Sequence, residues 1–186
     1  ALAEDRIHYG GDEPYYSEPL RVQGMVQANE SLTISAQTVA VPTGFLQAIS
    51  FYLNTDPKQD LDFMTPDRFW ASTSAASGSG KPKIYTIIGT NFVFAPSPDS
   101  SYTGKISYYK KMDALSGSAT TNWLITNSPG TYLYACMLEA YILDKDYDEA
   151  RIMFDLFKSR INGLIRHDKQ MRYSGSHLQM RPDKVA

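Results

Sequence analysis

The chain has 186 residues and a mass of 20.8 kDa, which suits one domain or at most two and is enough to bury a hydrophobic core. Charged residues make up 20% and hydrophobic residues 42%, so the composition is that of an ordinary globular protein. The net charge of −2 gives no sign of a nucleic-acid or membrane partner, and no apolar run is long enough for a membrane helix. The single cysteine, Cys136, excludes an intrachain disulfide, and its apolar surroundings predict a buried small hydrophobe.

The charge is distributed unevenly along the chain. From Lys158 to the last residue there are seven Lys or Arg and two Asp or Glu, a net charge of +5, so residues 1–157 carry −7. An acidic body with a basic C-terminal segment indicates that this segment has a partner of its own.

The N-terminal segment is predicted to be a short helix that leads into β structure. Residues 1–9 are rich in helix formers, and the glycine pair that follows ends this helix before a proline-containing loop. Leu20 and Val22 alternate with polar residues and indicate a first strand, which is disturbed near Gly24.

Strand patterns then continue to about residue 112. A polar, acidic loop is predicted at 55–62, and Thr65-Pro66 has the signature of a short helix that ends at about Ser72. Gly89-Thr90 suits a tight hairpin turn between two strands. The further predicted strands are Phe45–Leu53, which we expect to be buried, Lys83–Ile88, Asn91–Ala95 and Tyr102–Lys111.

The last third of the chain predicts an αα-hairpin. Ser128-Pro129 is a helix start, with Ser as N-cap and Pro at the first helical position, and this helix should end at about Leu143. The acidic residues at 144–149 are predicted to form a turn and to favour the positive end of a second helix at about 147–170. An apolar stripe at spacings of three and four predicts the core face of that helix: Ala150, Met153, Phe154, Phe157, Ile161, Leu164 and Ile165.

Catalytic or metal chemistry is not indicated by any residue pattern. The three histidines, His8, His167 and His177, are far apart, and none has a partner at metal-ligand spacing. We expect His167 to lie on the solvated surface. No nucleophile, base and orienting group can be assembled, and there is no phosphate-binding loop. We therefore predict no catalytic residue, no metal site, no cofactor and no enzymatic activity.

The basic C-terminal segment is the candidate binding element. We predict that residues 171–186 form an extended arm after a domain at 1–170, and an arm that becomes ordered on binding can wrap around a partner. Two alternatives are a contact with nucleic-acid phosphates and a frayed terminus. The candidate binding residues are Arg166, Lys169, Arg172, Tyr173, Leu178, Met180, Arg181 and Pro182.

Several stretches, in this order, resemble the head-to-tail adaptor proteins of tailed bacteriophages. Each stretch is weakly specific alone, but together with the basic tail they cover nearly the whole chain. They are Ala3–Ile7, the proline-containing turn Val41–Leu46, the G-x-P-x-x-Y pattern Gly80–Tyr85, the strand and loop Ile106–Leu115, and Thr121–Leu124.

The resemblance implies a structural role in the virion, at the head–tail junction, after assembly in the cytoplasm of the bacterial host. Such adaptors form rings, typically of twelve copies, under the portal protein. The ring extends the DNA channel and is a platform for the tail or nozzle protein. In this chain, residues 166–182 would be the arm that docks on the portal or a neighbouring copy. Packaged DNA would pass without sequence-specific binding, and no membrane is involved.

The predicted fold class is α+β. We expect a helical bundle built from the N-terminal helix and the C-terminal αα-hairpin at about 128–170, with an antiparallel β region inserted at about 20–112 and an extended C-terminal arm. A tail-tube or nozzle ring protein is the first alternative and would have more sheet and no helical hairpin. The others are an enzyme with paired carboxylates, such as a glycan hydrolase, and a nucleic-acid-binding module that uses the basic tail.

Overall fold

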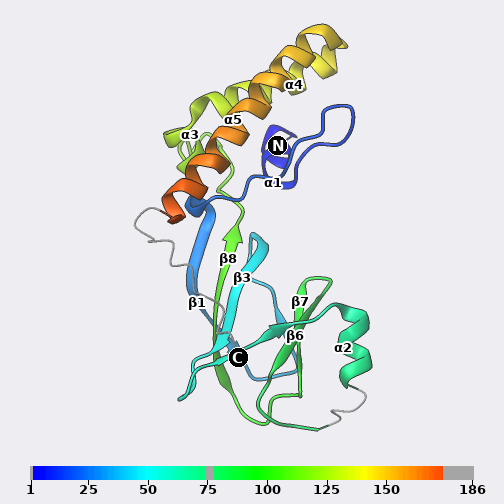
Figure 1. Cartoon of the computed structure of the whole chain (residues 1–186), viewed down its shortest axis with the longest axis vertical. Coiled ribbons are helices and arrows are strands. Elements are labelled where there is room, and N and C mark those ends of the chain that lie inside the picture. Colours follow the sequence, from blue (N-terminus) through cyan, green and yellow to red (C-terminus); the bar gives the residue numbers. More distant parts are fainter. Residues whose placement is uncertain (1, 74–77, 174–186) are drawn as a thin grey trace, which may run out of the picture. The chain divides into compact units, whose positions relative to one another are not determined.

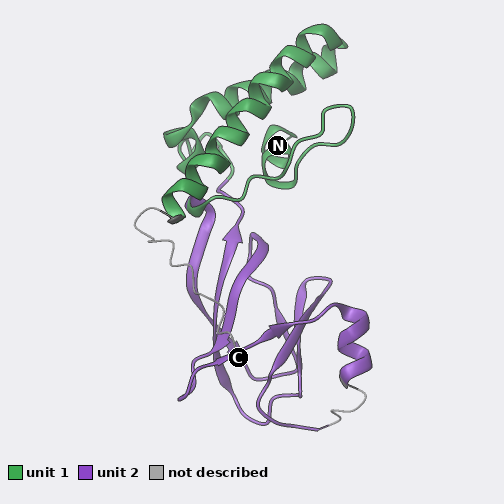
Figure 2. Cartoon of the chain, in the orientation of Figure 1, with its two compact units in different colours: residues 1–23, 114–186 green, residues 24–113 purple. Residues whose placement is uncertain are grey.

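The computed structural model describes residues 2–73 and 78–173, and the chain divides into two compact units (Figures 1 and 2). Unit 1 consists of residues 1–23 and 114–186, and unit 2 of residues 24–113. The chain therefore begins in unit 1, builds the whole of unit 2 and then returns to complete unit 1.

Unit 1 is helical. Its helices α4 and α5 form the predicted αα-hairpin, and α1 packs against α4. A short helix, α3, follows Asn122, and its first turn is capped because the Asn122 side chain accepts a hydrogen bond from the Ile125 N–H at 3.0 Å. The α-helices of unit 1 in the described part of the chain are α1 (Leu2–Tyr9), α3 (Trp123–Asn127), α4 (Pro129–Asp144) and α5 (Tyr147–Tyr173).

Local sequence signals set the turn of the hairpin. Pro129 stands at the start of α4 as predicted, although the Ser128 hydroxyl contacts the Thr131 hydroxyl at 2.9 Å and does not cap the backbone. Lys145 ends α4 in the left-handed conformation, at a φ of 60°, and its N–H donates to Ile142. Asp146 then accepts from the Glu149 N–H at 3.3 Å, so the turn residue also begins α5.

The predicted apolar stripe of α5 is the core face of the helix. Ala150, Phe154, Phe157 and Ile161 are buried, and the remaining members of the stripe are half-buried. The first predicted strand, which was expected to run from Leu20 through Val22 and Met25-Val26, begins only at Val26. Leu20 donates its N–H to the Ile7 carbonyl at 2.9 Å and pairs with no described strand. Its apolar side chain is nevertheless fully buried.

Unit 2 contains two four-stranded sheets and one α-helix among its described residues. The helix α2 (Pro66–Thr73) packs on the second sheet through Phe69, which contacts Val93 and Ala95. The Gly89-Thr90 hairpin is confirmed, and Gly89 has a φ of 60°.

The first sheet has the order β1 (Val26–Ile34), β8 (Tyr102–Lys110), β3 (Phe45–Leu53) and β4 (Gln59–Asp60); the second has β2 (Thr38–Ala40), β7 (Asn91–Ala95), β6 (Ile84–Ile88) and β5 (Asp62–Phe63). A 3-10 turn, Gln23–Met25, precedes β1.

Aromatic side chains from both sheets form the core of unit 2. Phe51 of β3 makes an edge contact with Tyr85 of β6, with ring centres 5.1 Å apart, and also meets Phe92 and Phe94. Gly104 lies against this cluster, and a Cβ there would come within 2.8 Å of both Ile34 and Phe51. Ile34 of β1 and Phe51 of β3 therefore meet over β8 within the first sheet, and this close approach requires glycine at position 104.

The predicted helical bundle is wrong. Within residues 2–73 and 78–173, eight strands form two sheets beside the five α-helices, and a nine-residue hydrophobic cluster is built from residues of both sheets. The fold is α+β with a mainly β-sheet core, because the aromatic residues of the two sheets bury one another. The β region is also not purely antiparallel, because β5 pairs with β6 in parallel. β5 starts at Asp62, the last residue of the loop predicted at 55–62.

Candidate interaction surfaces

Apolar side chains lie exposed on both helices of the hairpin. Leu143 of α4 is 72% exposed, and Leu133, Ile152 and Leu156 are exposed as well. Cys136 of α4 is exposed too, so its predicted burial is wrong. An apolar helix gives no sign in its sequence of which face is covered, and such a helix is usually covered all round by other protein. The hairpin therefore presents a surface suited to protein contact.

Only half of the predicted binding residues fall within the described part of the chain. Arg166 and Lys169 are exposed on α5, and Tyr173 is its last residue. Arg172 forms an ion pair with Asp168, with 2.8 Å between Nε and Oδ2, and the other Asp168 oxygen accepts from the Gln23 N–H at 2.6 Å. The remaining predicted residues, Leu178, Met180, Arg181 and Pro182, and most of the predicted arm, lie outside the described residues.

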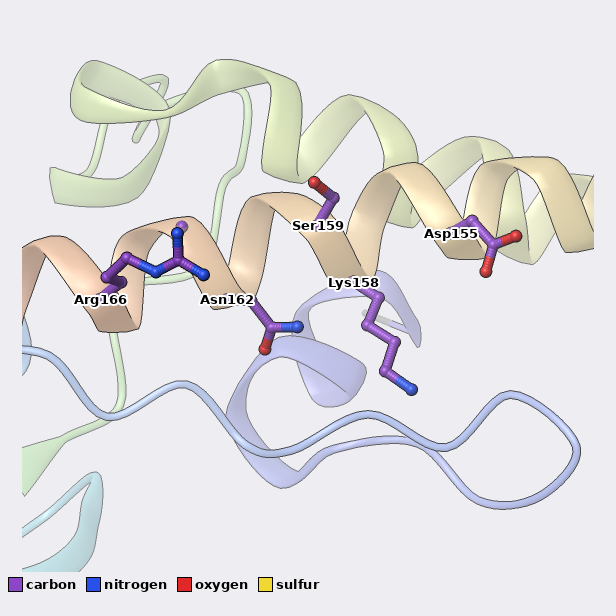
Figure 3. Close-up of a pocket in the computed structure, with 6 residues that line it drawn as sticks. Asp155, Lys158, Ser159, Asn162 and Arg166 are labelled. Carbon is purple, nitrogen blue, oxygen red and sulfur yellow. The ribbon is translucent and has the colours of Figure 1, made fainter.

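A shallow depression of about 500 Å³ runs along the exposed side of α5 (Figure 3). In Figure 3, Lys158 and Asn162 project from one side of the helix and Ser159 from the opposite side. These polar groups do not converge on one point, so they form no anion-binding or catalytic cluster. A second depression, of about 560 Å³, is lined by Tyr134 and Leu156 among others. Both depressions fit a protein contact better than a small ligand, because they are open and have few convergent polar groups.

Gly163 lines both depressions in the middle of α5. Gly163→Ala is expected to raise the free energy of unfolding by about 0.5–1 kcal/mol, because glycine is a poor helix former. An added Cβ would meet no atom within 4 Å. Urea unfolding followed by circular dichroism measures the change. Gly104→Ala is the opposing control and should destabilise the protein; a loss of stability in Gly163→Ala would contradict the prediction.

Titratable groups do not gather into a reactive site among the described residues. No cluster of three His, Cys, Asp or Glu side chains there could hold a metal ion. His8 is buried in α1, whereas His167 is exposed on α5, as predicted. Of the predicted histidines, His177 lies outside the described residues. No helix in the described part of the chain has the length and apolar character to cross a membrane.

Three tyrosines have pKa values that are raised by burial. Burial raises the pKa of Tyr85 and of Tyr132. The pKa of Tyr108 is raised first by burial and then by the hydrogen bond that its hydroxyl donates to Glu30, at 2.6 Å. A raised pKa keeps each phenol neutral at pH 7, so these side chains act in packing and hydrogen bonding.

Comparison with known protein families identifies the family of this chain. The family model of the SU10 adaptor protein matches residues 2–181, a range that includes every described helix and strand. No curated protein matches the chain. The matched family is one of structural phage proteins and is not an enzyme family. Because the match extends over nearly the full sequence, this chain belongs to the SU10 adaptor protein family of phage adaptor proteins, which are structural components of the virion.

Proposed function

We propose that this protein is a head-to-tail adaptor, which forms a ring on the portal protein, extends the DNA channel and provides the platform for the tail. The observation that carries the proposal is the exposed apolar surface of the α4–α5 hairpin in a chain of a phage adaptor family. A structural protein of a virion has to bind other proteins on several sides. The exposed apolar side chains of the hairpin are unfavourable in water and would be covered by such a contact.

Neighbouring copies would form the ring through the hairpin. A contact between two different surfaces of the same chain closes into a ring when the rotation between copies is right. We expect twelve copies, following the resemblance to head-to-tail adaptors. The net charge of −7 on residues 1–157 suits a channel wall, because it would not hold the packaged DNA tightly and would read no sequence.

The portal contact would come from the basic end of α5 and the arm beyond it. Arg166 and Lys169 are exposed, and Arg172 and Tyr173 follow on the same helix. The segment continues with Leu178, Met180, Arg181 and Pro182 in the sequence. Many weak arm contacts, repeated around a ring, would add up through avidity. The adaptor would then sit at the head–tail junction of the virion after assembly in the cytoplasm of the host bacterium.

A tail-tube or nozzle ring protein is the second candidate. The prominence of the two sheets favours it, because such a protein would contain more sheet than the expected adaptor. The ordered α4–α5 hairpin speaks against it.

Electron microscopy of the protein mixed with the portal protein of its own particle tests the proposal. We expect a ring of density directly beneath the portal. Binding to purified tail or nozzle components without any binding to the portal would favour the second candidate. No association with the portal at any protein ratio would overturn the adaptor proposal.

Removal of residues 174–186 is expected to abolish portal binding and to leave the fold unchanged. This truncation keeps α5 and the Arg172–Asp168 ion pair. Co-sedimentation with the portal measures binding, and thermal unfolding checks the fold. Lys169→Glu should also weaken binding, whereas Lys83→Glu, at an exposed lysine of unit 2 outside the hairpin, serves as the charge-matched control. Normal binding of the truncated protein would exclude the arm as the portal contact.

A further inference from the structure

An apolar groove lies in unit 2 between β3 of the first sheet and β5 and β6 of the second, strands that Figure 1 labels in part. Its volume is about 490 Å³, which is within the range of ligand pockets. Phe63 and Ile49 are 55% and 50% exposed beside it. The lining residues that the argument uses are Phe45, Leu46, Ile49, Asp62, Phe63 and Ile87.

One strand beside the groove, β3, has an open backbone edge without a strand partner. β3 pairs with β8 along its length, but β4 covers only Tyr52 and Leu53 on the other side. Among the described residues, no strand therefore lies against 45–50 on that side. Beyond β5, residues 86–88 of β6 have no described strand either, but Thr86 is fully buried and α2 packs against β6, so β3 alone keeps an open edge. Unpaired N–H and C=O groups of this kind are a template for an added strand.

The shape of β3 favours a flexible occupant over the edge of another sheet. The pairing of β3 with β8 shifts register twice, between Phe45 and Gln47 and between Ala48 and Ser50. Such bulges bend a strand and prevent flat pairing between the edges of two folded sheets. A flexible peptide can follow the bend, whereas β3 of a second copy would carry the same bulges.

The charge of the groove restricts its occupant further. Asp62 is the only charged residue among those that line it, and its side chain is exposed. Asp60, two residues earlier, is also exposed. A carboxylate at the rim of an apolar groove favours a partner that brings Lys or Arg to that place and apolar side chains elsewhere.

We propose that this groove binds an extended segment of another protein, which adds a strand to the edge of β3, places alternate apolar side chains among Phe45, Ile49 and Phe63, and sets a Lys or Arg beside Asp62. The proposal gives unit 2 a partner site that is separate from the hairpin and the arm. It does not depend on the adaptor proposal, because its evidence lies in the backbone edge of β3 and the lining of the groove in unit 2.

A synthetic peptide of eight residues that alternates valine with threonine, with one lysine at its end, tests the proposal on the full chain. We expect saturable binding by fluorescence anisotropy and slower amide exchange at 45–50. A peptide of the same length and charge with two central valines replaced by proline is the control, because proline cannot complete the strand ladder. Equal binding of both peptides, or protection only outside β3, would overturn the proposal.

Three variants distinguish binding in the groove from nonspecific binding to apolar surface. Ile49→Ser should weaken peptide binding by about tenfold, the loss expected for one apolar side chain at the contact. Ile88→Ser removes an exposed isoleucine that does not line the groove and should bind as the unchanged protein does. Asp62→Lys should weaken the lysine peptide by about threefold and strengthen a peptide with glutamate in its place.

Thermal unfolding of each variant confirms that the fold is kept. Affinities unchanged in both Ile49→Ser and Asp62→Lys would overturn the proposal. Protection of 45–50 that rises with protein concentration in the absence of peptide would assign the groove to a second copy and would also overturn it. None of these measurements uses the portal, so failure here is distinct from failure of the adaptor proposal.

Discussion

Phe157→Ala is expected to lower the free energy of unfolding by about 3–5 kcal/mol, the range measured for large-to-small changes of buried aromatic residues. Phe157 is fully buried in the middle of α5, between the buried residues Phe154 and Ile161 of the same stripe. Its removal would leave a cavity that the helix backbone cannot collapse to fill. Urea unfolding followed by circular dichroism at 222 nm reports on the helices of unit 1 and measures the change.

The neighbouring residue provides the matched control for this experiment. Leu156 is 40% exposed, and Leu156→Ala should cost less than about 1 kcal/mol. A loss below about 1 kcal/mol in Phe157→Ala itself would mean that the stripe is not a core in the isolated protein. Because the chain has two units, unfolding is followed with a second signal, tyrosine fluorescence, to show whether both units unfold together.

Glu139→Ala is expected to cost about 3 kcal/mol, the low end of the cost of breaking a buried ion pair. Arg6 of α1 and Glu139 of α4 form a salt bridge, with side chains only 13% and 17% exposed. Arg6 also donates to the Tyr15 carbonyl at 3.1 Å. Loss of the carboxylate would leave the Arg6 guanidinium charged and without its partner in a site with little water. The contact between α1 and α4 would therefore be weaker.

A double-mutant cycle isolates the energy of this pair. Glu139→Ala combined with Arg6→Met should cost less than the sum of the two single changes, because the unpaired charge is then removed. Glu149→Ala, at an exposed position, is the control and should change stability by less than about 0.5 kcal/mol. Strict additivity of Arg6→Met and Glu139→Ala would show that the pair contributes nothing beyond its separate side chains.

The helical hairpin is the part of the fold that local signals predicted well. Ser128-Pro129 marked the start of α4, the acidic residues at 144–149 marked the turn, and spacings of three and four marked the core face of α5. The Gly89-Thr90 turn was predicted for a similar reason. In each case the signal and the structure that it produces lie within a few residues of one another.

The interaction surfaces were predictable only in part. Arg166 and Lys169 were identified from the basic charge of the C-terminal segment, and both are exposed on α5. The exposed hairpin face was missed because α4 is apolar on all sides and its sequence has no polar face to show which side is covered. The groove of unit 2 was missed as well, because β4 is only two residues long and its shortness is what leaves the edge of β3 open.

The sequence by itself determined the α4–α5 hairpin, the β hairpin at Gly89-Thr90 and the basic character of the C-terminal segment, since helix caps, periodicity and turn residues act over short distances. Tertiary structure alone decided that Phe51 meets Tyr85 across two sheets, that Arg6 pairs with Glu139 and that Cys136 faces outward. These contacts join residues far apart in the chain, and the apolar faces that become buried are those whose shapes pack together best. The β-sheet core in place of a helical bundle follows from the same competition.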